Sequence, residues 1–442
     1  MVTAIVGRAF LTHYNAKHNT DWSAKDFFER EYWTYFYNHP KYMQWLSNSP
    51  FVQMKKGQKP HLLTSAERAE KLGDLARKVE NGATDASIAI GYPASEDSEF
   101  ATTSGQVTDL RLTPSEETIY CSWIGSGFGV GVSGGQILLF DHPLILDTLF
   151  AGWQQYRNHL NDPAYDNLPG NKINTWNGQW LSHALGEYYV EHSPLRGFAA
   201  NAFTIEPGKE IEIKTQSWLN VLLSVAHRIP LDTLTGYVYK MGQTNSTFGF
   251  IPFRLTQLQR PEQIYRHLFG EGEYQSDRDK IRALYGTAKS FQRICEMGAV
   301  GVAALEPKGL RDIMQGGKYK PSDDITFKTY ITWLLAMLNN NDSWEEVGRA
   351  AELLLRYETT TKRTKDLSTV QENQVEAIRS ATSKKQFIDA LTQIMMKANE
   401  TMLEDMEALG KKVHQMPTDN FAYFQALLRL RYARQSREKD QQ

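Results

Sequence analysis

Amide, lysine and tryptophan side chains gather in one short stretch of the chain, residues 168–180. It reads Leu-Pro-Gly-Asn-Lys-Ile-Asn-Thr-Trp-Asn-Gly-Gln-Trp. Amide groups can hydrogen-bond to base edges, lysine can contact phosphate, and an indole can stack on a base or wedge between bases. An ordered loop, with asparagines in turns and tryptophans in the core, explains the same residues without a ligand. The candidates for base contact are Asn171, Lys172, Asn174 and Asn177.

Six glycines crowd into the preceding stretch, residues 125–135, and from Gly129 they fit the pattern Gly-x-Gly-x-x-Gly. A dinucleotide site needs a helix after that motif, but residues 136–140 have the pattern of a strand. No Lys-Ser or Lys-Thr follows, which excludes a phosphate loop, and we expect no cofactor. Gly127, Gly129 and their neighbours are instead expected to let two strands turn tightly or to let the backbone approach another chain closely.

The signals for catalysis are weak. Glu212-Ile213-Lys214 resembles half of a Mg²⁺-dependent nuclease centre, but the Pro-Asp half is missing, and alternating charge on an exposed strand explains it as well. The eleven histidines form no His-Glu-x-x-His motif, and Cys121 and Cys295 have no partner at motif spacing. We therefore expect a non-enzyme without a metal. Free cysteines and the lack of an export signal favour the cytoplasm.

The net charge of −2 hides a basic segment, because residues 214–320 contain 15 Lys and Arg against 9 Asp and Glu. Basic residues interleaved with aromatic ones are typical of a surface that binds a polyanion. A solvated helix face with compensating acids is the alternative. No stretch approaches the ~20 apolar residues of a membrane span. The candidate phosphate contacts are Arg278, Lys280, Arg282, Lys289 and Arg293, with Lys55, Lys56 and Lys59 in a separate Gly- and Pro-containing loop.

The hydrophobic patterns predict an α+β fold: an irregular mixed N-terminal part with antiparallel strands, followed by an all-α C-terminal bundle. In the bundle, Ser343 with Glu346 and Ser383 with Gln386 have the spacing of capping boxes. We expect three regions: 1–117, aromatic-rich and mainly helical; 118–320, mixed α/β; and 321–442, helical. The expected elements are helices over 20–50, 65–80 and 216–228, strands over 118–140 and 209–214, and an acidic loop over 95–104.

The order of these features resembles a known family. An aromatic N-terminal region is followed by the glycine-rich stretch, then by Asp141-His142-Pro143, Gly152-Trp153 and the amide segment, and the chain ends in a helical bundle. This is similar to the large subunit of a type I CRISPR Cascade complex. It is most like the I-B group and the short versions carried by CRISPR-associated transposons. The resemblance spans most of the chain, but its motifs are diffuse.

The resemblance implies a non-catalytic subunit of a crRNA-guided complex that recognises the protospacer-adjacent motif on duplex DNA and helps to open the duplex. Its implied partners are crRNA-bearing backbone subunits, target duplex and displaced strand, and a recruited helicase-nuclease or transposition targeting protein, with no membrane. The bundle resembles the family's small subunit, which an internal start at Met314 or Met337 would produce separately.

The resemblance also suggests roles for the candidate residues. The amide segment would read the motif, with the Gly125–Gly135 stretch near the duplex. Lys55, Lys56 and Lys59 would hold phosphates, and the basic residues from Arg278 to Arg293 would contact the guide-bound or displaced strand. A Mg²⁺-dependent nuclease using Glu212 and Lys214, or a protein-only scaffold, are the alternatives.

Overall fold

A computed structural model of the chain describes residues 1–46, 49–83, 86–88, 94–95, 107–108, 114–240, 246–315, 323–340, 342–360 and 365–440. The acidic loop predicted over 95–104 lies outside these residues apart from Ser95. The chain divides into two compact units. Unit 1 comprises Met1–Leu255 and Phe291–Ala299, and unit 2 comprises Thr256–Ser290 and Val300–Gln442. The division predicted near residues 117 and 320 stays a prediction.

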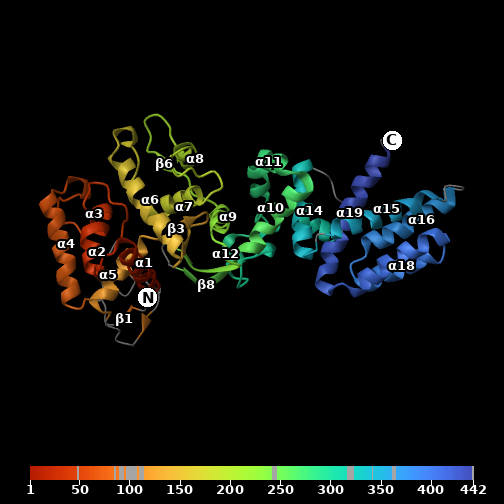
Figure 1. The fold of residues 1–442 in the computed structure, drawn as a ribbon, viewed down its shortest axis with the longest axis horizontal. Helices are drawn as coiled ribbons and strands as arrows, with labels where there is room; N and C mark the ends of the chain where they lie inside the picture. The colour runs from red at the N-terminus through yellow and green to blue at the C-terminus, as the bar shows by residue number, and fades with distance from the viewer. Residues whose placement is uncertain are drawn as a thin grey trace. The chain divides into compact units, whose positions relative to one another are not determined.

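Unit 1 combines helices with a four-stranded antiparallel sheet in the order β3-β4-β7-β8 (Figure 1). In this sheet Gly131 lies opposite Ile137, and Leu138 lies opposite Val238. The sheet strands are β3 (Val130–Val132), β4 (Gln136–Leu139), β7 (Thr233–Lys240) and β8 (Ser246–Arg254). Two-residue strands form two further pairs, β1 (Ala94–Ser95) with β2 (Val107–Thr108) and β5 (Phe203–Thr204) with β6 (Glu212–Ile213).

The helices of unit 1 are mostly short and surround an aromatic core. The Tyr32 and Phe36 rings stack at 4.1 Å, as do those of Tyr37 and Phe51. The aromatic residues of unit 1 thus build a core. The helices are α1 (Val2–His18), α2 (Ala24–Phe27), the π-helical turn η1 (Phe28–Tyr32), α3 (Trp33–Phe36), α4 (Ser65–Glu80), α5 (Glu116–Ser126), α6 (Pro143–Asn161), α7 (Ile173–Ala184), α8 (Phe198–Ala202), α9 (Trp218–Arg228) and α12 (Phe291–Cys295), with short 3₁₀ turns η2 (Pro60–Leu62) and η5 (Pro163–Tyr165).

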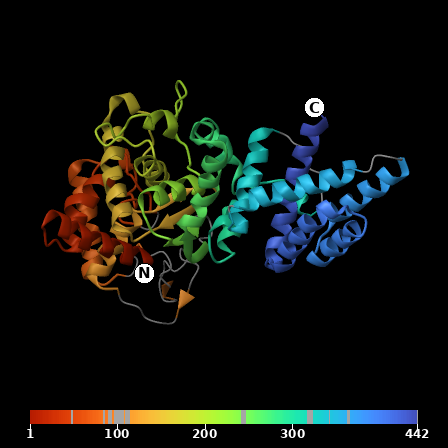
Figure 2. The same cartoon turned by 45° about the vertical axis from the view of Figure 1, so that its right-hand side comes forward.

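Unit 2 is helical. In it α15 and α19 pack side by side, and α14 packs against α11 and α19; the last helices are blue in Figure 2. Its helices are α10 (Leu255–Phe269), α11 (Glu271–Leu284), the 3₁₀ turn η6 (Val302–Leu305), α13 (Leu310–Met314), α14 (Asp324–Leu338), α15 (Ser343–Thr360), α16 (Lys365–Ser380), α17 (Lys384–Met395), α18 (Glu400–Gln415) and α19 (Thr418–Asp440).

The α+β class with a helical C-terminal part is confirmed, as are the helices over 65–80 and 216–228. Ser383 caps α17 by accepting a hydrogen bond from the Gln386 backbone, as predicted. The Ser343 cap is wrong, because Ser343 is the first residue of α15 and not the residue before it.

Four interpretations of the sequence differ from the structure. Residues 118–126 belong to helix α5 and not to a strand, and the amide segment from Ile173 onward is helix α7 and not a loop. The helix predicted over 20–50 ends at Phe36, and the strand over 209–214 shrinks to Glu212–Ile213. The alternating residues of α5 suggested a strand because every residue from Ile119 to Ser126 is buried. A helix that is buried on all sides shows no amphipathic pattern in its sequence.

Candidate nucleic-acid interface

The glycine-rich stretch and the amide segment pack against each other inside unit 1. A Cβ atom on Gly129 would lie 2.8 Å from the Asn174 Oδ1 atom, and one on Gly178 would lie 2.3 Å from the Gly131 carbonyl oxygen. Only glycine permits this approach, so these residues let α7 lie directly on β3. The close approach predicted for the glycine backbone therefore takes place within the chain itself.

Asn177 is fully buried at this contact. Its Nδ2 atom donates hydrogen bonds to the carbonyl oxygens of Gly127, at 2.8 Å, and Gly129, at 2.9 Å. Gly127 is confined as well, since a Cβ atom there would lie 2.7 Å from the Trp153 ring. Asn174 is half-buried, with its Oδ1 atom against Gly129. The structure thus gives Asn177, Gly127 and Gly129 a packing role and turns Asn174 inward, so none of these four residues is placed to read a base.

Asn171 and Lys172 lie outside this contact, exposed at the start of α7. Asn171 has a left-handed backbone with φ of 35°, and its N–H donates to the Tyr42 carbonyl oxygen. The N–H of Ile173 donates to the Met43 carbonyl oxygen at 3.3 Å. These bonds fix the start of α7 beside the segment around residue 42.

An exposed tryptophan, which the sequence did not single out, belongs to that segment. The Trp45 side chain is 46% exposed, although most aromatic side chains of unit 1 are buried, and its ring lies 6.4 Å from that of Tyr42. We name Trp45, Asn171 and Lys172 the α7 corner. Within the described residues Lys172 has no ion-pair partner. The corner offers an amide, an ammonium group and an indole on a surface fixed by backbone hydrogen bonds.

The loop that carries Lys55, Lys56 and Lys59 is partly neutralised by acidic residues. Lys55 lies 3.0 Å from a Glu70 carboxylate oxygen, and this hydrogen bond raises the pKa of Lys55. Lys56 and Lys59 are exposed and have no acidic partner among the residues that the structure describes. Below them, the buried Lys71 ammonium group donates to the Pro50 carbonyl oxygen at 3.2 Å and holds the loop in place. Two of the three predicted phosphate contacts, Lys56 and Lys59, are therefore uncompensated.

Every predicted phosphate contact of the basic segment has an acid beside it. Arg282 is the most constrained: its guanidinium group makes a bidentate pair with Glu262 at 2.7 and 3.0 Å, and it also donates to the Tyr274 hydroxyl at 3.3 Å. Arg282 is thus part of the packing of unit 2, and three of its five N–H donors are already engaged with Glu262 and Tyr274, which suits it poorly to phosphate contact. The other pairs are Arg278 with Asp279, Lys280 with Asp277, Lys289 with Glu306, and Arg293 with Glu296.

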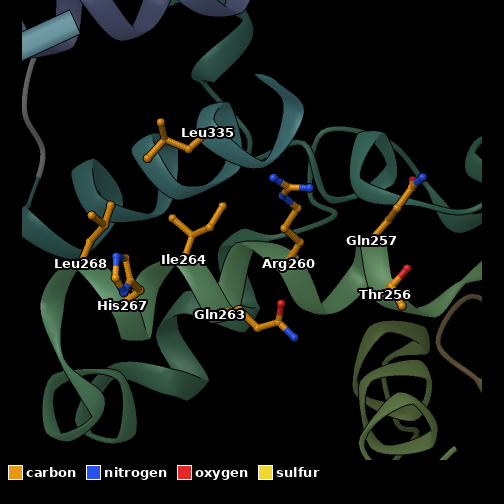
Figure 3. Close-up of a pocket in the computed structure, with 8 residues that line it drawn as sticks. All are labelled: Thr256, Gln257, Arg260, Gln263, Ile264, His267, Leu268 and Leu335. Atoms are coloured by element: carbon orange, nitrogen blue, oxygen red, sulfur yellow. The ribbon is translucent and has the colours of Figure 1, made fainter. Parts of the chain in front are cut away.

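A groove in unit 2, about 320 Å³ in volume, runs along one face of α10. Figure 3 shows Arg260 and Ile264 rising from α10 toward α14, which carries Leu335. Arg260 lies within the basic segment 214–320, but no local sequence pattern predicts the groove, because its lining comes from both α10 and α14. The lining residues are Thr256, Gln257, Arg260, Gln263, Ile264, His267, Leu268 and Leu335.

The candidate catalytic residues of the sequence analysis are Glu212 and Lys214. Glu212 and Lys214 are exposed at β6, and the Lys214 ammonium group lies 3.4 Å from the Ala200 carbonyl oxygen. Burial raises the pKa of Cys121 and of Cys295 to about 12. Among the described residues, no three His, Cys, Asp or Glu side chains are grouped so as to hold a metal ion. In the same part of the chain, no helix is long and apolar enough to cross a membrane.

Comparison of the chain with protein-family models, with curated proteins and with solved structures finds no match.

Proposed function

We propose that this chain is the non-catalytic large subunit of a crRNA-guided type I CRISPR effector complex and that it works in the cytoplasm. In this proposal it binds duplex DNA at the protospacer-adjacent motif, supports R-loop formation, and recruits a helicase-nuclease or a transposition targeting protein. The order of motifs along the chain supports the family. The helical C-terminal part, from α14 to α19, agrees with a bundle of the small-subunit kind.

The α7 corner is the observation that carries the proposal. Asn171 presents an amide that can hydrogen-bond to a base edge, and Lys172 presents an uncompensated ammonium group for phosphate. Trp45 adds an exposed ring that can stack on an unpaired base. Because backbone bonds to residues 42 and 43 fix the start of α7, these groups meet the DNA without first being ordered.

The first test is purification of the tagged chain from the cell that encodes it, followed by sequencing of the bound RNA and identification of the bound proteins. We expect repeat-derived guide RNA and several copies of a backbone subunit. A stable protein assembly without nucleic acid would instead favour a scaffold. Cleavage of duplex DNA by the pure chain in Mg²⁺, abolished by Glu212→Ala, would favour a nuclease and overturn the proposal.

The second test measures binding of the assembled complex to target duplexes that carry a library of flanking motifs. We expect Asn171→Ala to lower discrimination between motifs by roughly 5- to 150-fold, which is the contribution of one base contact. We expect Lys172→Ala to weaken all motifs alike and to reduce the salt slope by about 1. Lys209→Ala, which removes an exposed lysine already paired with Glu206, is the control. If Asn171→Ala and the control behave alike, Asn171 does not read the motif.

A further inference from the structure

The α10 groove is unusual in its charge. Residues 256–290, all of which the structure describes, contain six Lys and Arg residues. Five of them have an acid within ion-pair distance: Arg266 with Glu271, Arg278 with Asp279, Lys280 with Asp277, Arg282 with Glu262, and Lys289 with Glu306. Arg260 is the sixth, and within this stretch and the rest of the described chain no acid pairs with it.

Arg260 is nevertheless held in place. Its guanidinium group donates to the Oδ1 atom of Asn339, the left-handed residue (φ of 54°) that ends α14. An amide orients the guanidinium group without neutralising it. Because guanidinium has five N–H donors in a planar fork, donors are left for a ligand in the groove.

The rest of the lining suits the same kind of ligand. It contains no carboxylate, and Thr256, Gln257, Gln263 and His267 all carry side chains able to donate hydrogen bonds. Together with Arg260, the residues Gln257, Gln263 and His267 recur about once per turn of α10, so these donors are about 5.4 Å apart along the helix. Ile264 and Leu335 provide an apolar floor.

We infer that the α10 groove binds a ligand with two or more linked phosphates, supplied either by a free nucleotide or by the backbone of a polynucleotide. The cation and the neutral donors match phosphate oxygens, and their repeat along the helix favours linked phosphates over a single small anion. The apolar floor would cover the sugar or base beside them. This inference does not depend on the proposed function, because it concerns unit 2 and makes no use of the α7 corner.

The test uses the full-length chain and two probes, a nucleoside triphosphate without metal and a fluorescent twelve-residue oligothymidylate, with binding followed by calorimetry and anisotropy. We expect Arg260→Gln to weaken binding about tenfold or more. Gln263→Glu, which leaves Arg260 and its bond to Asn339 intact but puts a carboxylate in the groove, should weaken it about as much. Arg356→Gln, a loss of an exposed charge that is paired with Asp405 in the same unit, should change affinity less than about twofold.

The two probes separate the sources of phosphate. Loss of affinity for the triphosphate in both groove variants assigns a nucleotide site, and loss confined to the oligonucleotide assigns a polynucleotide backbone. The inference is overturned if neither probe binds, or if binding survives both Arg260→Gln and Gln263→Glu in protein whose thermal unfolding is unchanged. If no guide RNA accompanies the chain but the groove variants still lose nucleotide binding, the proposed function fails and this inference stands.

Discussion

Buried cations in unit 1 hold the chain where it has no regular structure. Arg157 is 7% exposed and donates hydrogen bonds to the carbonyl oxygens of Tyr35, at 3.0 Å, and Lys41, at 3.1 Å. Burial lowers its pKa to about 10, so it stays charged at neutral pH. Lys71 does the same for the Pro50 carbonyl oxygen. These cations thus supply donors to backbone carbonyl groups at the end of α3 and in the segments that follow it.

His39 lies between Tyr35 and Lys41, whose carbonyl groups Arg157 binds. We expect protonation of His39 to make the protein less stable in mild acid. Burial, and next the charge of Arg157, lower its pKa to about 4, and its Nδ1 atom accepts a hydrogen bond from the Lys41 N–H at 2.9 Å. The unfolded chain, with a histidine pKa of about 6.5, binds the proton more readily. The stabilisation of the folded state by the neutral His39 ring is therefore at its full value above about pH 6.5, and it is lost as the pH falls toward 4.

Urea unfolding at pH 7.5 and pH 4.5 measures this effect. Between these pH values we expect the free energy of unfolding of the native chain to fall by about 1–2 kcal/mol more than that of His39→Asn. The expected difference is smaller than the full pKa shift implies, because the ring is only half-buried. The asparagine amide can accept the Lys41 hydrogen bond and does not titrate, so the variant is the matched reference. An equal loss in both proteins would show that His39 does not titrate in this way.

At the level of elements, the pattern of exposure decides what the sequence can predict. Helices such as α15 and α17 show one apolar and one polar face, and their repeats are readable from the sequence. Helix α5 is buried on all sides, and in α7 glycine and asparagine face β3, so neither sequence resembles an amphipathic helix. For the same reason Asn177 resembled a ligand-binding residue although it satisfies backbone carbonyls.

Helices α1 and α5 cross with their backbones in close contact. A Cβ atom on Gly7 would lie 2.0 Å from the Cys121 carbonyl oxygen, and one on Gly125 would lie 1.8 Å from that of Thr3. Backbone faces backbone here, so no side chain can rotate away. We expect Gly7→Ala and Gly125→Ala each to lower the free energy of unfolding by about 3 kcal/mol or to prevent folding.

Thermal unfolding of these variants beside Gly73→Ala tests the crossing. Gly73 lies inside the α4 helix, and the nearest atom to an added Cβ would be the Arg77 guanidinium nitrogen at 3.7 Å. The same substitution there should stabilise the protein by about 0.5–1 kcal/mol through helix propensity. If Gly7→Ala were as harmless as the control, α1 and α5 would have to lie farther apart than in this structure.

Across the whole molecule, charge counted along the sequence did not reveal which cations are available. Arg282 pairs with Glu262 and Lys289 pairs with Glu306, so acids well separated along the chain compensate cations of the basic segment. Some residues of the remaining candidate surfaces were predictable from the sequence, and others were found only in the structure. Asn171 and Lys172 were predictable from residue type, whereas Trp45 and the Arg260 groove depend on tertiary packing that no local pattern encodes.

The same long-range packing predicts which C-terminal fragment can fold if one is made from an internal start. α14 packs against α19, where the Trp333 and Tyr423 rings lie 5.7 Å apart and Arg434 covers the Phe327 ring at 5.1 Å. A chain starting at Met337 lacks nearly all of α14. The lost burial of its Trp and Phe side chains alone should cost about 3–6 kcal/mol.

We therefore expect residues 314–442 to unfold cooperatively in urea and residues 337–442 to lack a cooperative transition. Trp333→Ala in the longer fragment should lower its stability by about 3–5 kcal/mol and so tie the difference to this contact. Equal stability of the two fragments would mean that α15 to α19 form a complete core without α14. In that case Met337, and not Met314, would be the better candidate for an internal start, because the shorter product would already be a folded bundle.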